Sequence, residues 1–143
     1  MTLSAILYAV GAFICLASAD FFLKLSAGRI SSSLGTLVYA VTAVVPAAIW
    51  VAWQKISHES LQFTREGALA SIAVGISFSL VVVFLSLTFA NGANLSIASP
   101  VIRLLGIVLA SSLGILVLGE EFSLRYAFGV LLTFAGIYFI ITR

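Results

Sequence analysis

The chain has 143 residues, of which 62% are hydrophobic and only 8% are charged. Its mean hydropathy of +1.25 is higher than a water-soluble domain can cover with polar surface, which argues against a soluble globular fold. The net charge of +2, without a run of Lys and Arg among aromatic residues, argues against a nucleic-acid partner.

Apolar segments alternate with short polar ones along the whole chain. The apolar segments cover residues 3–23, 34–53, 68–90, 95–118 and 124–141. Each is about as long as a bilayer core requires, and backbone groups in lipid must bond within their own segment, so each is expected to be a helix. The sequence therefore predicts an all-α integral membrane protein, a bundle of five transmembrane helices forming one domain over residues 1–143. The first segment is longer than the apolar part of a cleavable signal peptide, so we expect it to be retained.

The polar connections give further detail about the helix ends. Trp50 and Trp53 close the second segment where an aromatic belt is expected at the membrane interface. The connection 91–94 predicts a tight turn in which Gly92 adopts positive φ and the Asn94 side chain caps the following helix. The third and fourth segments are therefore expected to form a hairpin.

An odd number of spans places the loop cations on two sides of the membrane. The N-terminal side carries Lys55, Arg65 and Arg125, and the opposite side carries Lys24, Arg29 and Arg143. Orientation follows an excess of Lys and Arg in cytoplasmic loops, and three against three gives no excess. Two explanations remain: balance by chance among few charges, or insertion in both orientations with formation of an antiparallel dimer. Transporters built from inverted repeats place the substrate site at the repeat interface.

Two ionisable side chains, Asp20 and Arg103, fall inside predicted spans. Each costs several kcal/mol if it faces hydrocarbon without a partner, so both are functional candidates. At 1.5 Å rise per residue, Asp20 lies about 10 Å beyond the centre of the first span and Arg103 lies off the centre of the fourth toward the same membrane face. An ion pair between them is one hypothesis; the other pairs Asp20 with Lys24, one helical turn on.

One face of the fourth segment is small and polar. At 100° per residue the residues that share about 60° of this helix are Ser96, Ser99, Arg103, Gly106, Ala110 and Gly114. This face is either a packing seam with a structural arginine or a cavity wall on which Arg103 meets an anionic group. Pro100 lacks the N–H that would bond the Ser96 carbonyl, so we expect a kink there, and Pro46 predicts the same in the second segment.

The remaining polar residues do not indicate an enzyme. His58 lies in the most polar loop beside Glu59 without a second His or Cys close enough for a metal site. Glu120 and Glu121 precede the fifth segment, where carboxylates stabilise a helix N-terminus. Because nucleophile–base pairs, phosphate-binding loops and metal-ligand spacings are missing from the sequence, we expect neither an enzyme nor a cofactor or metal.

Several residues in the second half of the chain match a known family pattern. Gly119-Glu120, followed by Ser123, Gly129 and Gly136 and preceded by Pro100-Val101-Ile102-Arg103, resembles the end of a repeat in EamA-type members of the drug/metabolite transporter superfamily. The similarity extends over essentially the whole chain. Larger members have ten helices in two inverted halves, and this resemblance implies that the chain is one half.

A second resemblance is to the small multidrug resistance proteins of the same superfamily. The run 23–28 resembles the end of their first helix, and Gly129 and Gly136 resemble the glycine pair of their dimerising last helix. This resemblance implies an antiparallel homodimer. The membrane glutamate of those proteins falls at Leu16 in this chain, so their proton-coupled exchange is not carried over; Asp20, one turn further on, is the candidate for a related role.

Together these patterns predict a transporter of small metabolites or drug-like solutes in a prokaryotic inner membrane, working by alternating access. Its expected partners are a small-molecule substrate, the lipid bilayer and a second copy or paralogue. The alternative is a flippase for lipid-linked sugars, or an accessory membrane subunit, that acts with a paralogous partner. In the transporter hypothesis Arg103 orients the substrate with Ser96, Ser99 and Pro100 nearby, and Asp20 is its counter-charge or a protonatable switch.

Overall fold

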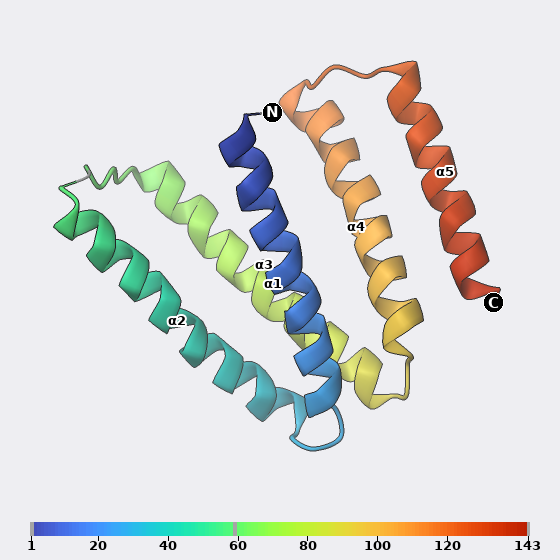
Figure 1. Ribbon diagram of the computed structural model, residues 1–143, viewed down its shortest axis with the longest axis horizontal. Helices are drawn as coiled ribbons and strands as arrows, with labels where there is room; N and C mark the ends of the chain where they lie inside the picture. Colours follow the sequence, from blue (N-terminus) through green and yellow to red (C-terminus); the bar gives the residue numbers. More distant parts are fainter. Residues whose placement is uncertain (1, 59, 143) are drawn as a thin grey trace. The chain divides into compact units, whose positions relative to one another are not determined.

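The computed structural model describes residues 2–58 and 60–142, and over these ranges the chain is all-α. The helices are α1 (Leu3–Ser26), α2 (Ser32–Ile56), α3 (Arg65–Ala90), α4 (Leu95–Leu118) and α5 (Leu124–Ile141), and the described ranges contain no strand (Figure 1). All five helices are long and apolar enough to cross a membrane. The predicted all-α membrane fold is confirmed, and the chain is a multi-pass membrane protein.

The helix ends agree with the apolar segments at α4 and α5 and extend beyond them elsewhere. Helix α1 continues to Ser26 rather than ending at residue 23, and α3 begins at Arg65 rather than at residue 68. Helix α2 is longer than its apolar segment at both ends. Hydropathy marks only the part of a helix that lies in hydrocarbon, whereas backbone hydrogen bonding continues into the polar interface.

Side-chain caps begin three of the helices. The hydroxyl oxygens of Thr2, Thr64 and Ser123 accept hydrogen bonds from backbone N–H groups in the first turns of α1, α3 and α5. The predicted cap by the Asn94 side chain is wrong. The N–H of Ile97, which such a cap would use, donates instead to the Asn94 carbonyl at 3.1 Å. Gly92 adopts the predicted positive φ, at 89°.

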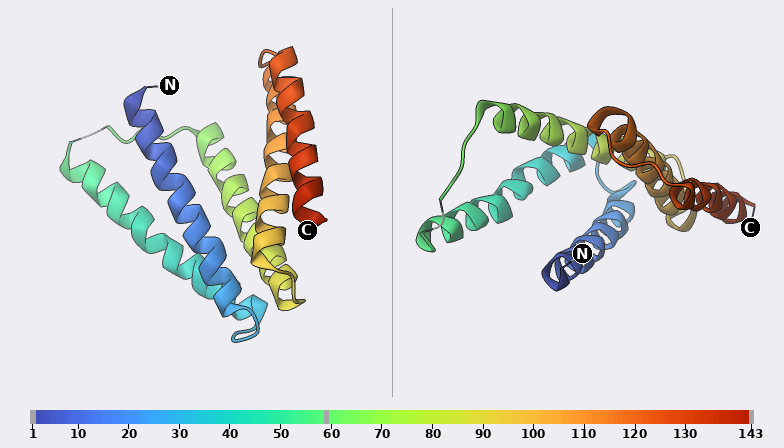
Figure 2. Two further views of the ribbon diagram at one scale, coloured as in Figure 1. Left: turned by 45° about the vertical axis from the view of Figure 1, so that its right-hand side comes forward. Right: turned by 90° about the horizontal axis from the view of Figure 1, so that it is seen from above.

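By its internal contacts the chain divides into two compact units, Met1–Gly92 and Ala93–Arg143, which are described separately. In the first unit, α3 packs against both α1 and α2. Helices α2 and α3 run antiparallel and diverge toward the loop that joins them (Figures 1 and 2). Accordingly, α2 contains no buried residue, and three of its four half-buried positions, Ser32, Gly35 and Thr36, lie in its first turns.

The second unit is a hairpin of α4 and α5, which lie side by side and antiparallel (Figure 2). The hydroxyl groups of Ser111 on α4 and Tyr126 on α5 form a hydrogen bond of 2.5 Å. This bond joins the two helices next to their connecting loop. Hydrocarbon offers these hydroxyl groups no other hydrogen-bond partner. The bond therefore favours this pairing of α4 with α5 over other pairings of the two helices.

Most large apolar side chains are exposed. Among the described residues only Leu85, Phe89 and Ile137 form buried apolar positions, whereas every helix exposes Leu, Ile, Val or Phe along its length. In water such a surface would aggregate, but lipid tails are as apolar as these side chains and cover them without cost. The exposure agrees with helices that face lipid or other membrane helices.

Candidate functional site

Asp20 is a buried ionisable residue near the end of α1. Its exposed fraction is 5%, the lowest of any residue in that helix. Ser86 of α3 is the other buried polar residue of the described chain, with an exposed fraction of 8%. A carboxyl group buried in a membrane helix is expensive, which supports the sequence-based choice of Asp20 as a functional candidate.

Lys24, one turn after Asp20, contacts α3. Its ammonium nitrogen lies 5.5 Å from the ring centroid of Phe89, the most buried apolar side chain of the described chain. This is cation–π geometry. The contact joins the last turn of α1 to the last turn of α3. It could not be predicted from the sequence, because nothing in the spacing of residues 24 and 89 indicates that they are close.

The two pairing hypotheses for Asp20 both remain predictions. Asp20 belongs to the first unit and Arg103 to the second, and each unit is described by itself. The cation–π contact places the Lys24 ammonium against an aromatic ring of the protein rather than in the headgroup layer alone.

The predicted polar face lies on α4, which is one continuous helix through Pro100. Arg103 is half-buried, as are Ser99 and Pro100, whereas Ser96 is exposed. The predicted kinks at Pro100 and Pro46 stay predictions. Because Arg103 lies about a third of the way along a helix of 24 residues, it falls well inside the apolar span.

The small residues proposed for helix packing occupy two different environments. A Cβ added at Gly106, Gly129 or Gly136 would meet nothing within 4 Å, so these three glycines border open space, and Ala110 is exposed. Gly114 differs. It is the buried residue of α4, and an added Cβ there would lie 2.6 Å from a carboxylate oxygen of Glu120.

The expectation that Glu120 stabilises the N-terminus of the fifth helix is wrong. Ser123 caps α5, whose first turn contains no acidic residue. The Glu120 carboxylate lies over Gly114 instead. The reason is the conformation of Gly119, whose positive φ of 69° turns the chain back toward α4.

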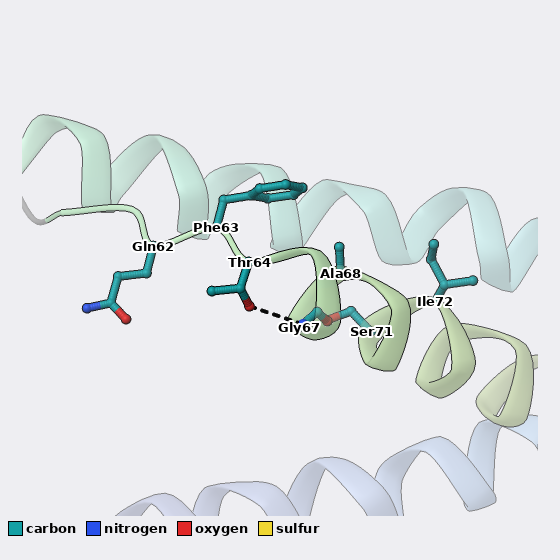
Figure 3. Close-up of a pocket in the computed structure, with 7 residues that line it drawn as sticks. All are labelled: Gln62, Phe63, Thr64, Gly67, Ala68, Ser71 and Ile72. Carbon is teal, nitrogen blue, oxygen red and sulfur yellow. Dashed lines mark hydrogen bonds between the residues drawn. The ribbon is translucent and has the colours of Figure 1, made fainter.

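A shallow pocket of about 480 Å³ lies at the start of α3 (Figure 3). Figure 3 shows Phe63, Ala68 and Ile72 pointing to one side, and the capping hydrogen bond from the Gly67 N–H to Thr64 Oγ1 measures 3.1 Å. The lining is mainly apolar. The pocket lies at the opposite end of α3 from Phe89 and does not include Asp20 or Arg103.

The predicted distribution of cations between two membrane sides stays a prediction, and the structure places several of these residues on their own helices. Lys55 lies in the last turn of α2, Arg65 and Arg125 lie in the first turns of α3 and α5, and Arg143 lies outside the described residues. His58 is exposed, with φ of 54°, and Glu59 lies outside the described residues. In the ranges that the structure covers, no three His, Cys, Asp or Glu side chains are grouped as metal ligands.

No protein-family model, curated protein or solved structure matches the chain.

Proposed function

We propose that the chain is a half-size transporter of the drug/metabolite superfamily in a prokaryotic cell membrane, which moves a small polar solute by alternating access. The observation that carries the proposal is the half-buried Arg103 on the small, polar face of α4, inside a helix that otherwise suits lipid. A cation at that depth is expensive, and cations in such positions commonly mark substrate or ion pathways.

The buried carboxyl of Asp20 supports the same proposal. A protein that served only as a membrane anchor would gain nothing from burying an acid in α1, since replacement by an apolar residue would lower the cost of insertion. In the proposal Arg103 orients an anionic or polar group of the solute. Asp20 is the counter-charge or a group that takes up a proton during the cycle.

The working unit in this proposal is an antiparallel homodimer. The second copy would supply five helices in the inverted orientation, and alternating access would rock one copy against the other. Balanced cations on the two sides of the membrane permit insertion in both orientations. The open space beside Gly129 and Gly136 on α5 leaves room for a neighbouring helix to approach closely.

The test begins with the purified chain in detergent and a thermal-stabilisation screen of organic anions, cations and zwitterions. Compounds that raise the unfolding midpoint are then used in radiolabelled form as probes of uptake into proteoliposomes. We expect saturable uptake into proteoliposomes that contain this protein without any paralogous partner. Arg103→Ala should reduce uptake to the level of empty liposomes while membrane insertion is unchanged, because the half-buried cation would be lost from the α4 face.

Thr42→Ala is the control, since it removes an exposed polar side chain whose hydroxyl donates to carbonyls of its own helix and it leaves the balance of loop cations unchanged. Full uptake by Arg103→Ala would contradict the assignment of the site. Uptake that appears only after a paralogous chain is added would instead support the flippase or accessory-subunit alternative.

A further inference from the structure

The end of the α4–α5 hairpin contains a contact that neither helix capping nor the proposed transport site explains. The backbone N–H groups of Gly119 and Glu120 both donate to the carbonyl of Gly114, the latter at 3.2 Å. The side chain of Glu120 follows its backbone and covers the same residue, so that its carboxylate occupies the space where a Cβ of residue 114 would stand. Backbone and side chain of one loop residue therefore converge on one glycine.

This arrangement depends on two glycines with different roles. Gly119 has φ of 69°, a conformation that residues with side chains rarely adopt, and it reverses the chain at the end of α4. Gly114 is helical, and the space beside its Cα, where a side chain would otherwise stand, holds the Glu120 carboxylate; we call this space the niche. Among the described helical glycines, two would bring a Cβ closer than 3.0 Å to a side chain: Gly67 would lie 2.9 Å from the hydroxyl oxygen of its N-cap Thr64, and Gly114 would lie 2.6 Å from Glu120. Of the two, only Gly114 meets a carboxylate.

The niche lies on the small, polar face of α4 that carries Arg103. Eleven residues at 100° each bring Gly114 to within about 20° of Arg103 around the helix axis. At 1.5 Å per residue the two positions are about 16 Å apart along the axis. The carboxylate of Glu120 therefore covers the aqueous end of the face that carries Arg103, and the Ser111–Tyr126 hydrogen bond holds α5 beside it.

We propose that Glu120 is a latch: seated in the niche at Gly114, it holds the loop 119–123 against α4 and closes the end of the Arg103 face. The latch depends on the shapes of the side chains at positions 114 and 120 and not on the charge of Glu120. It needs a side chain of the length of Glu at position 120 and the absence of a side chain at position 114. It does not depend on the chain being a transporter.

The test measures the loop position directly in the full-length protein. In a Cys15→Ser background, spin labels on Glu121→Cys and Ile107→Cys, both exposed positions, report the distance between the loop and α4 by pulsed electron paramagnetic resonance. With the latch closed we expect one narrow distance distribution. Gly114→Ala, which displaces the carboxylate, and Glu120→Ala, which removes it, should each abolish the narrow distribution and shift the mean to longer distance.

Two controls distinguish a latch from a general loss of order. Gly106→Ala makes the same chemical change in the same helix where nothing lies within 4 Å, and it should leave the narrow distribution intact. Glu120→Gln keeps the length and shape of the side chain and should also keep the latch closed. The double variant Gly114→Ala/Glu120→Ala should match either single variant, because both open the same contact.

The proposal is overturned if Gly114→Ala leaves the distance unchanged, if Glu120→Gln opens the loop as fully as Glu120→Ala, or if the two opening variants have additive effects. None of these measurements uses a substrate. Failure of the latch is therefore distinguishable from failure of the proposed transport function.

Discussion

Individual side chains decide how polar groups are accommodated in a protein that is nearly all apolar. Lys24 directs its ammonium onto the Phe89 ring, an interaction worth about 2 kcal/mol when desolvated. Hydroxyl groups of Ser18, Thr42 and Thr88 donate to carbonyls one turn earlier in their own helices, at 2.8–2.9 Å. These local bonds let exposed polar residues remain in membrane helices without a partner from another helix.

Gly119 carries the strictest backbone requirement of the α4–α5 loop. Gly119→Ala should destabilise the protein by about 1–2 kcal/mol, because an L side chain in the left-handed region approaches the following carbonyl. The measurement is the thermal unfolding midpoint in detergent. Gly75→Ala in the middle of α3 is the control: it meets open space and should be neutral or stabilising. Equal midpoints for the two variants would show that the turn tolerates another conformation.

At the scale of elements, the helices differ in how much of their surface the chain itself covers. Helix α2 has no buried residue, whereas α3 buries Leu85, Ser86 and Phe89 in its last turns. Helix α5 buries only Ile137, and its glycines at 129 and 136 border open space. Helix α2 therefore leaves the most surface for lipid or for a second copy, and α5 leaves open space beside its two glycines.

The homodimer proposal predicts a specific effect of filling the α5 surface. Gly136→Leu should leave the fold of the single chain intact, because a Cβ added at this position meets nothing within 4 Å and leaves open space for the start of the side chain. If a second copy packs there, the bulk should cost about 1–3 kcal/mol and weaken dimerisation by about tenfold or more. Dimer fraction in detergent, measured by light scattering across a dilution series, reports the change.

Gly11→Leu on α1 is the matched control, since that glycine also borders open space. A dimer that survives Gly136→Leu as well as it survives Gly11→Leu would remove α5 from the interface.

For the whole molecule, the feature with the widest consequence is the balance of cations between the two membrane sides. Five spans would place Lys55, Arg65 and Arg125 on the N-terminal side of the membrane and Lys24, Arg29 and Arg143 on the other; Arg143 lies outside the described residues. Carboxylates contribute little to orientation, so Glu66, Glu120 and Glu121 do not break the balance. With this arrangement of spans, we expect the loop cations to favour neither orientation.

Dual insertion is testable with a single engineered cysteine. In a Cys15→Ser background, Ser57→Cys places a thiol in the exposed loop after α2. A membrane-impermeant maleimide applied to intact bacterial cells should label one part of the population, and the remainder should become reactive only after permeabilisation. Labelling wholly from one side would contradict dual insertion.

The same loop offers a charge control for orientation. Ser60→Lys together with Gln62→Lys raises the cation count on the N-terminal side and should move this loop into the cytoplasm in most copies, because the excess of Lys then favours that orientation. The intact-cell labelling of Ser57→Cys should fall accordingly. An unchanged ratio would show that loop charge does not set the topology of this chain.

The spans and their helical state follow from the sequence alone, because each is a property of one segment. A run of apolar residues long enough for the bilayer must satisfy its own backbone hydrogen bonds, whatever the rest of the chain does. The bounds of α4 and α5 and the positive φ of Gly92 were accordingly predictable. Asp20 and Arg103 were also identifiable from the sequence, since a charge in an apolar run is visible without a structure.

Only the tertiary structure decided which side chains meet. The burial of Ser86, the contact of Lys24 with Phe89, the Ser111–Tyr126 bond and the seat of Glu120 on Gly114 depend on residues brought together by packing and by the turn at Gly119. Helical spacing places residues on the faces of one helix but contains no information about the rotation of that helix against its neighbour. For this reason Glu120, which in sequence precedes α5 like a capping residue, lies on α4 instead.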